Sequence, residues 1–193
     1  DLYNKNRVYR KRTPFMWCPE CQTSIAQVEL NDKSKSSKFV YIKFDTSVGE
    51  PITIATTRPE LMPACVGIHV HPDDKRFKKF IGKKAKLPIF NREVGIYANK
   101  DVDMEFGTGV VYHCTFVDMD YVEWIEKMKI EPIEVMNKDG SFNHKAGKYK
   151  GMKSAQAREA IIKDLEEIGA VVKVEPIEHV VNVHERCGTD IEI

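Results

Sequence analysis

Alternating apolar and polar positions run through most of this chain of 193 residues, and a period of two predicts β-strands. The strand-like segments are 39–44, 51–56, 66–70, 85–89, 94–98, 109–114, 170–175 and 179–183. Apolar residues follow helical spacing at 118–129 and at 154–168. Many strands with few helices predict an α/β fold, built as a β-rich barrel with peripheral helices rather than as a doubly wound sheet.

Local signals indicate where some of these elements begin and end. Ser154 is expected to be the N-cap of the second helix, and Gly169 stands where a C′ glycine ends a helix. The Ser/Lys-rich residues 31–38 are short enough to form a hairpin loop between strands.

Composition is that of a well-packed soluble protein, with 42% hydrophobic and 31% charged residues. No apolar run approaches the roughly 20 residues that a membrane-spanning helix needs, and the polar, basic start does not resemble a signal peptide. We therefore expect a cytoplasmic protein without a membrane partner. The net charge is only +1, but bases gather at 5–12, 75–86 and 145–153. These clusters permit a nucleic-acid face, and a solvated lysine-rich surface is the alternative.

Five cysteines, an odd number, argue against a disulfide framework. Cys18 and Cys21 form a CxxC pair, and His184 and Cys187 form an HxxC pair near the other end. Together they supply three thiolates and one imidazole, which is a complete tetrahedral set for a structural Zn²⁺. The alternative is two buried thiols and an exposed strand histidine. The remaining cysteines lie in apolar strands and are expected to be small core residues: Cys65 and Cys114.

Two threonines and an arginine end the strand-like run PITIATTRPELMPA at 51–64. Arg58 offers a planar fork of donors suited to phosphate or ribose, and the hydroxyls of Thr56 and Thr57 can donate or accept. The alternative is a strand end with a surface ion pair between Arg58 and Glu60.

A second stretch, FGTGVVYH at 106–113, places glycines on both sides of a threonine just before a strand. Gly107 and Gly109 would let the backbone at Thr108 come close to a ligand. Asp118 and Asp120 follow at the expected start of a helix, where one carboxylate can be an N-cap and the other can hold a cation. No Ser-His-Asp or Cys-His arrangement is evident.

In this order, ATTRPE, FGTGVV, the acidic helix start and HERCGTDIEI resemble the editing domain of the valyl-tRNA synthetase family, in its archaeal-type form. This domain is an insertion in class I synthetases for valine, isoleucine and leucine. The resemblance extends from WCPEC at 17–21 to RCGTDIEI at 186–193. It implies an entering connector with the first zinc knuckle at 1–38, an editing body at 39–178, and an exiting strand with the second knuckle at 179–193.

The resemblance implies hydrolysis of threonine wrongly esterified to the 3′ end of tRNA(Val). The partners would be that tRNA and the rest of the synthetase chain, which is usually a monomer. Zn²⁺ would be structural, whereas ATP and Mg²⁺ would serve only the full-length enzyme, since no HIGH-like or KMSKS-like signature occurs here. The rival interpretations are an isoleucyl or leucyl editing domain and a non-catalytic, zinc-stapled tRNA-binding module.

The resemblance also assigns site residues by position. The catalytic group would be Asp118, Asp120, Thr56 and Thr57. The substrate-binding group would be Arg58, Glu60, Gly107, Thr108, Gly109, Tyr112 and Cys114. Relatives commonly carry the second acid three residues after the first, where this chain has Tyr121, so either Asp120 fills the role or Asp118 acts alone. Bacterial-type members have Lys and Thr at positions 112 and 114, and many relatives have a hydroxyl residue in place of Leu61.

Overall fold

The computed structural model describes residues 1–10, 13–115 and 122–193. The strands are β1 (Trp17–Cys18), β2 (Thr23–Ser24), β3 (Leu30–Thr46), β4 (Ile52–Thr56), β5 (Cys65–Val70), β6 (Lys84–Leu87), β7 (Arg92–Ala98), β8 (Val110–Cys114) and β9 (Val171–His184). The helices are α1 (Val122–Lys127) and α2 (Ser154–Glu167), with 3-10 turns η1 (Gln27–Glu29), η2 (Pro59–Ala64), η3 (Lys78–Phe80) and η5 (His144–Tyr149). Among the described residues, no helix combines the length and apolar character needed to cross a membrane.

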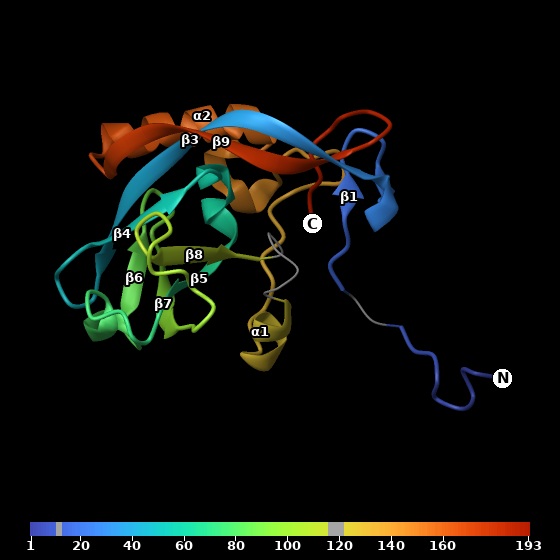
Figure 1. The fold of residues 1–193 in the computed structure, drawn as a ribbon, viewed down its shortest axis with the longest axis horizontal. Helices are drawn as coiled ribbons and strands as arrows, with labels where there is room; N and C mark the ends of the chain where they lie inside the picture. The colour runs from blue at the N-terminus through green and yellow to red at the C-terminus, as the bar shows by residue number, and fades with distance from the viewer. Residues whose placement is uncertain (11–12, 116–121) are drawn as a thin grey trace.

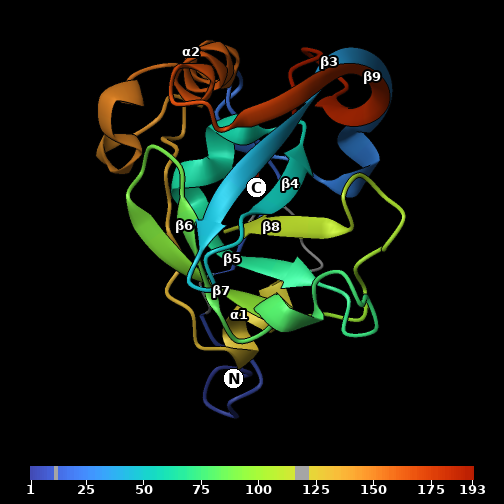
Figure 2. The ribbon, with the colours of Figure 1, turned by 90° about the vertical axis from the view of Figure 1, so that its left-hand side faces the viewer.

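The main sheet has the strand order β4-β3-β6-β7-β5-β8, with β9 paired to β3 outside this path (Figures 1 and 2). Its two end strands, β4 and β8, are joined by side chains instead of a backbone ladder. The Tyr112 hydroxyl donates to the carbonyl of Arg58, and the Thr56 hydroxyl lies 3.4 Å from the Tyr112 oxygen. The sheet is therefore a nearly closed barrel, which confirms the predicted fold class.

Side-chain alternation explains why these segments form the barrel. Along β4, Ile52, Ile54 and Thr56 are buried while the residues between them are partly exposed. Inward residues of the other strands, including Phe44 and Ile68, are fully buried, and each such side chain contributes about 1.5–3 kcal/mol by leaving water. The strands predicted at 51–56, 66–70, 85–89, 94–98 and 109–114 are confirmed as β4 to β8 within one to two residues at each end.

The two predicted ends of α2 have different outcomes. Gly169 has φ of +69°, and the amide of Ala170 donates to the carbonyl of Leu165 at 2.9 Å, so the helix ends in the expected glycine motif. The N-cap is Lys153, so the prediction for Ser154 is wrong. Ser154 is instead the first helical residue, and its hydroxyl donates to a Glu192 carboxylate oxygen at 3.3 Å.

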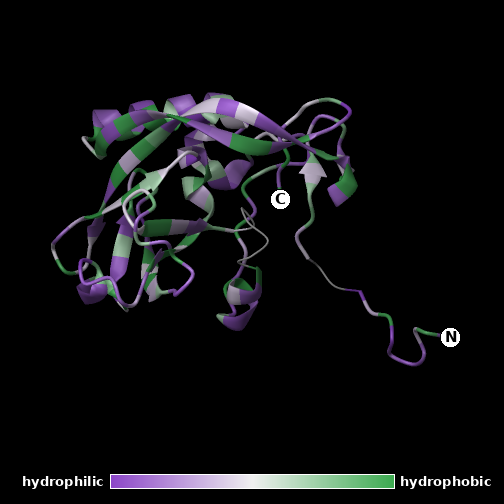
Figure 3. Cartoon of the chain, in the orientation of Figure 1, coloured by the Kyte–Doolittle hydropathy of each residue, from purple (hydrophilic) through white to green (hydrophobic). Residues whose placement is uncertain are grey.

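A long antiparallel ribbon, β3 paired with β9, extends from the barrel to the base of the molecule (Figure 1). The register runs from Leu30 opposite His184 to Ile42 opposite Val171. The hairpin loop predicted at 31–38 is therefore wrong, because these residues are the first half of β3. Pairing along the ribbon overrides the loop propensity of serine and lysine, and the alternating hydropathy of the ribbon in Figure 3 fits one solvated face. The segments 170–175 and 179–183 likewise belong to one strand, β9.

Helix α1 packs on a pair of buried histidines through Trp124. The Trp124 ring lies 4.4 Å from the His69 ring and 5.3 Å from the His113 ring, and the two imidazoles stack at 5.4 Å. The described helix covers residues 122–127 of the one predicted at 118–129 and ends two residues early, and residues 118–121 lie outside the described residues.

Buried His69 makes stability depend on pH. Burial, with a smaller contribution from His113, lowers the pKa of His69 to about 4, whereas an unfolded histidine titrates near 6.5. Between these values the unfolded chain binds more protons, so stability is expected to fall as the pH drops from 6.5 to 4, by about 3 kcal/mol from this group. Denaturant unfolding followed by tryptophan fluorescence should show a flatter profile in this range for His69→Gln. Exposed His144→Gln should keep the parent profile, and equal slopes in all three proteins would contradict the assignment.

Candidate functional site

The TTR sequence, residues 56–58, lies where β4 ends, at the seam of the barrel between its two end strands β4 and β8. Thr56 is 8% exposed, and its hydroxyl accepts a hydrogen bond from the Arg58 amide at 3.0 Å. Thr57, in the bend that follows β4, is instead a lining residue of a cavity of about 590 Å³. The first threonine therefore holds the turn that follows β4, and the second is available to a ligand.

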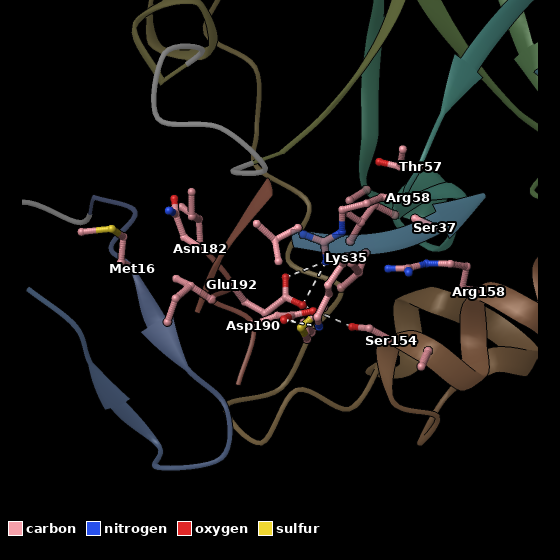
Figure 4. Close-up of a pocket in the computed structure, with 18 of the residues that line it drawn as sticks. Met16, Lys35, Ser37, Thr57, Arg58, Ser154, Arg158, Asn182, Asp190 and Glu192 are labelled. Carbon is pink, nitrogen blue, oxygen red and sulfur yellow. Dashed lines mark hydrogen bonds and ion pairs between the residues drawn. The ribbon is translucent and has the colours of Figure 1, made fainter. Parts of the chain in front are cut away.

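Elements that are distant in the sequence form the walls of this cavity (Figure 4). They are η2, the first turns of α2, the β3–β9 ribbon, residues 133–136 and residues 190–193. Thr115, the last described residue before 116–121, also lines it. Asp118 and Asp120, the predicted catalytic acids, lie outside the described residues.

Two arginines and two glutamates form a network at the cavity wall, in which Glu60 is buried and the other three side chains are partly exposed. Glu60 is fully buried and accepts from Arg58 Nε at 3.2 Å and from Arg158 Nε and Nη2 at 2.9 and 2.6 Å. Arg58 Nη2 also donates to both carboxylate oxygens of Glu192, at 2.9 and 2.7 Å. The Arg58–Glu60 pair expected on the surface therefore exists, but its carboxylate is buried, and the pair is part of a quartet whose formal charges cancel.

The quartet keeps Arg58 charged and fixes its orientation. Burial alone lowers the pKa of the Arg58 guanidinium, but Glu192 and Glu60 outweigh this effect and raise it above its ordinary value. Within the described part of the chain, the carboxylates take Nε and Nη2, and Nη1 makes no hydrogen bond. Because the surrounding charge is already balanced, the geometry suits a donor to a neutral ribose or ester oxygen better than an anchor for a phosphate.

Tyr112 and Cys114 lie behind the cavity wall instead of lining it. The Tyr112 hydroxyl is engaged by the Arg58 carbonyl, and burial raises the pKa of this phenol well above its ordinary value, so it stays a neutral donor. Cys114 faces Cys65 across the β5–β8 pair, and burial likewise raises the pKa of the Cys114 thiol. Both cysteines are buried, as expected for core residues.

The glycine stretch before β8 lies against the β3 and β4 side of the seam. Gly107 has φ of +60°, and a Cβ there would come within 3.1 Å of the Phe39 ring. A Cβ on Gly109, with φ of +75°, would come within 2.7 Å of the Met104 carbonyl oxygen. The protein's own packing thus requires both glycines. The Thr108 hydroxyl between them is buried and has no hydrogen-bond partner among the described residues, and none of the three lines the cavity.

Sequence reasoning missed Glu192 and Arg158. Arg158 stands four residues after Ser154, so both lie on one face of α2, and this spacing was an available signal. Glu192 reaches the site only because its backbone pairs with Trp17, and no local pattern indicates that pairing.

The four predicted metal ligands come together at the base of the molecule. Sulfur and nitrogen ligands of one tetrahedral Zn²⁺ lie roughly 3.5–3.8 Å apart. The Cys18–Cys187 sulfurs are 3.5 Å apart, and His184 Nδ1 is 3.5 and 3.4 Å from the sulfurs of Cys21 and Cys187. All four ligand atoms lie within 4.8 Å of one another, so the residues fit a closed structural zinc site. His184 is buried, so the exposed-histidine alternative is wrong.

Comparisons with known proteins place the chain in a family. Valine--tRNA ligases of Methanocaldococcus jannaschii, Thermoplasma acidophilum and Pyrococcus horikoshii are 48%, 48% and 47% identical to it, over the whole chain. The chain spans 22%, 24% and 22% of the length of these relatives. No protein-family model matches the chain.

Among solved structures, a leucyl-tRNA synthetase of Agrobacterium radiobacter K84, in a ternary complex with tRNA and LeuAMS, has a similar fold. The TM-score is 0.56 at 16% identity, over 80% of this chain and 24% of that chain. The relatives are aminoacyl-tRNA synthetases, and the nearly closed barrel has the fold of part of one of them, a leucyl-tRNA synthetase. Within that class, the chain belongs to the valyl-tRNA synthetase family and resembles its archaeal members.

Proposed function

We propose that this chain edits mischarged tRNA, by hydrolysing the ester that joins threonine to the 3′ end of tRNA(Val). The observation that carries the proposal is the cavity itself, where Thr57 and Arg58 meet Thr115, the residue that leads into the segment of Asp118 and Asp120. Kinship with valine--tRNA ligases supports a tRNA(Val) substrate.

Hydrolysis of this ester needs positioning more than a strong nucleophile. Water attacks the ester carbonyl, the C–O bond to the ribose breaks, and the released ribose oxygen takes a proton, which yields free threonine and deacylated tRNA. Arg58, aimed by Glu60 and Glu192, would donate from Nη1 to a ribose or ester oxygen, and Thr57 would supply a hydroxyl beside it. Asp118 or Asp120 would hold the substrate ammonium, as a carboxylate holds a cation.

Threonine and valine differ by a hydroxyl in place of a methyl group. A pocket that hydrogen-bonds the hydroxyl rejects valine, because valine would leave buried polar groups without partners. Zn²⁺ bound by Cys18, Cys21, His184 and Cys187 would stabilise the base and take no part in hydrolysis, since protein ligands fill all four positions. The other proposed partner is the remainder of a cytoplasmic, monomeric synthetase, for which ATP and Mg²⁺ serve only the synthetic reaction.

Deacylation of Thr-tRNA(Val) by the full-length protein tests this function. The double variant Asp118→Ala/Asp120→Ala is expected to lose about 10²–10⁴-fold in rate, whereas Asp101→Ala, an exposed acid before the glycine stretch, should keep the parent rate. Val-tRNA(Val) should be a poor substrate.

The same assay separates the rival functions. If the double variant binds tRNA and deacylates it as fast as the parent, the non-catalytic tRNA-binding module is correct and the hydrolase is not. Preferential hydrolysis of Val-tRNA would indicate isoleucyl-type editing specificity.

A further inference from the structure

Glu192 makes contacts in two parts of the molecule, the cavity wall and the segment that carries the first metal-ligand pair. Its carboxylate holds Arg58 in the cavity wall and accepts from the Ser154 hydroxyl (Figure 4). Its backbone pairs with Trp17, with the Trp17 amide 2.8 Å from the Glu192 carbonyl oxygen and the Glu192 amide 3.0 Å from the Trp17 carbonyl oxygen. Trp17 directly precedes Cys18, so one residue links the candidate site to the Cys/His cluster.

The second metal-ligand pair, His184 and Cys187, also holds the segment that carries Glu192. The amide of His184 donates to the carbonyl of Thr189 at 2.9 Å, and Val183 pairs with Asp190. The chain from Cys187 to Glu192 is therefore folded back along the end of β9 and is held between the two knuckles. The position of the Glu192 backbone depends on both metal-ligand pairs.

The side chain of Glu192 restrains a group that would otherwise have several orientations. An arginine has several rotatable bonds, and Glu60 holds only the Nε side of Arg58. Glu192 contacts Nη2 with both oxygens, and its side chain is only 16% exposed, so water competes little for the pair. With both carboxylates in place, the plane of the Arg58 guanidinium is fixed at the wall of the cavity that Arg58 lines.

We propose that Glu192 is a positioning residue for Arg58, and that the Cys/His cluster orders the site through the Trp17–Glu192 pair. The role of Arg58 in hydrolysis rests on the proposed editing function, whereas the structural coupling does not. Metal binding at the base would therefore affect the cavity wall. Loss of the metal would free the Arg58 side chain indirectly, by loosening the Trp17–Glu192 pair.

Hydrogen–deuterium exchange of the full-length protein, read by mass spectrometry, tests the coupling. In η2 and the residue before it, the amides of Arg58 and Leu61 are hydrogen-bonded to Thr56 and to the Arg58 carbonyl, which makes this segment a reporter. Glu192→Gln should raise exchange there roughly tenfold, because the negative charge and one of the two oxygens that accept from Arg58 Nη2 are lost. Glu192→Asp should give a smaller rise, and Glu178→Gln, on the solvated face of β9, should give none.

The second part of the exchange experiment removes the metal with a chelator. Chelation should raise exchange of the same segment in the parent protein and add little in Glu192→Gln, while the β6–β7 hairpin stays unchanged in both. The coupling is overturned if the chelator leaves the η2 segment as protected as before, or if Glu192→Gln does so.

Deacylation kinetics test whether Glu192 acts through Arg58. Glu192→Gln should slow hydrolysis of Thr-tRNA(Val) in the parent background, and should cost nothing further in an Arg58→Lys background, where the fork is absent. Equal losses in both backgrounds would mean that Glu192 does not act through Arg58. A parent protein without deacylation would instead refute the editing function, and the exchange experiment would still decide the coupling.

Discussion

Glu60→Gln is expected to destabilise the folded chain by about 3–5 kcal/mol, although it removes no atom from the core. Glu60 is fully buried and neutralises two guanidinium groups, Arg58 and Arg158, through hydrogen bonds of 2.6–3.2 Å. A neutral amide of the same size leaves an excess of buried positive charge. Denaturant unfolding of parent and variant measures the difference.

The matched control and a second substitution identify the cause. Glu159→Gln, beside Arg158 on α2 but at an exposed ion pair with Lys38, should change the free energy of unfolding by less than about 1 kcal/mol. Adding Arg158→Met to Glu60→Gln should recover part of the loss, since the unpaired cation is removed as well. A double variant as unstable as the sum of its single variants would argue against charge imbalance as the reason.

Removal of metal from the Cys/His cluster is expected to unfold the base and leave the barrel folded. The knuckles are joined to the barrel by the β3–β9 ribbon, and the barrel core of strands β4 to β8 is separate from them. A ligand at a thousand times its dissociation constant stabilises the folded state by about 4.1 kcal/mol, so the base depends strongly on bound Zn²⁺. Chelation should lower the thermal midpoint and raise hydrogen exchange in β1, β2 and residues 184–190.

Metal content provides the direct check. The parent should hold one zinc per chain, and Cys21→Ser/Cys187→Ser should hold none, at two positions exposed enough to tolerate serine. Cys65→Ala, at the buried Cys65–Cys114 pair in the barrel, should retain the metal. Zinc bound equally by the double variant would place the metal elsewhere.

The barrel strands could be predicted because their information is local. In β4, every second side chain is buried, and the apolar residues Ile52 and Ile54 show this alternation directly in the sequence. Residues 31–38 could not be predicted as strand, because their serines and lysines have loop propensity, and the partner that makes them a strand lies more than 130 residues away in β9. Ser154 failed as an N-cap for a related reason: its hydroxyl has a distant acceptor, Glu192.

The candidate site also combines residues that the local sequence predicted with residues that only long-range packing brings there. Thr57 and Arg58 were predicted to face a ligand because two hydroxyls and a guanidinium are unusual at the end of a strand, and both residues line the cavity. Glu60, Tyr112 and Thr56 lie behind the cavity wall, where they hold the Arg58 backbone and side chain in place. The sequence grouped Thr56 with Thr57, and only the tertiary structure shows that Thr57 alone of the two lines the cavity.

The sequence by itself determined the class of fold, the four candidate metal ligands and the motifs that place the chain among valyl-tRNA synthetases, because period, spacing and residue chemistry are properties of short segments. Tertiary structure decided how those segments act together. It closed the sheet through Tyr112, brought the knuckles together along the β3–β9 register, and paired Arg58 with Glu192, 134 residues away. These contacts follow from long-range packing, because the sequence around one residue does not predict which distant residue it will contact.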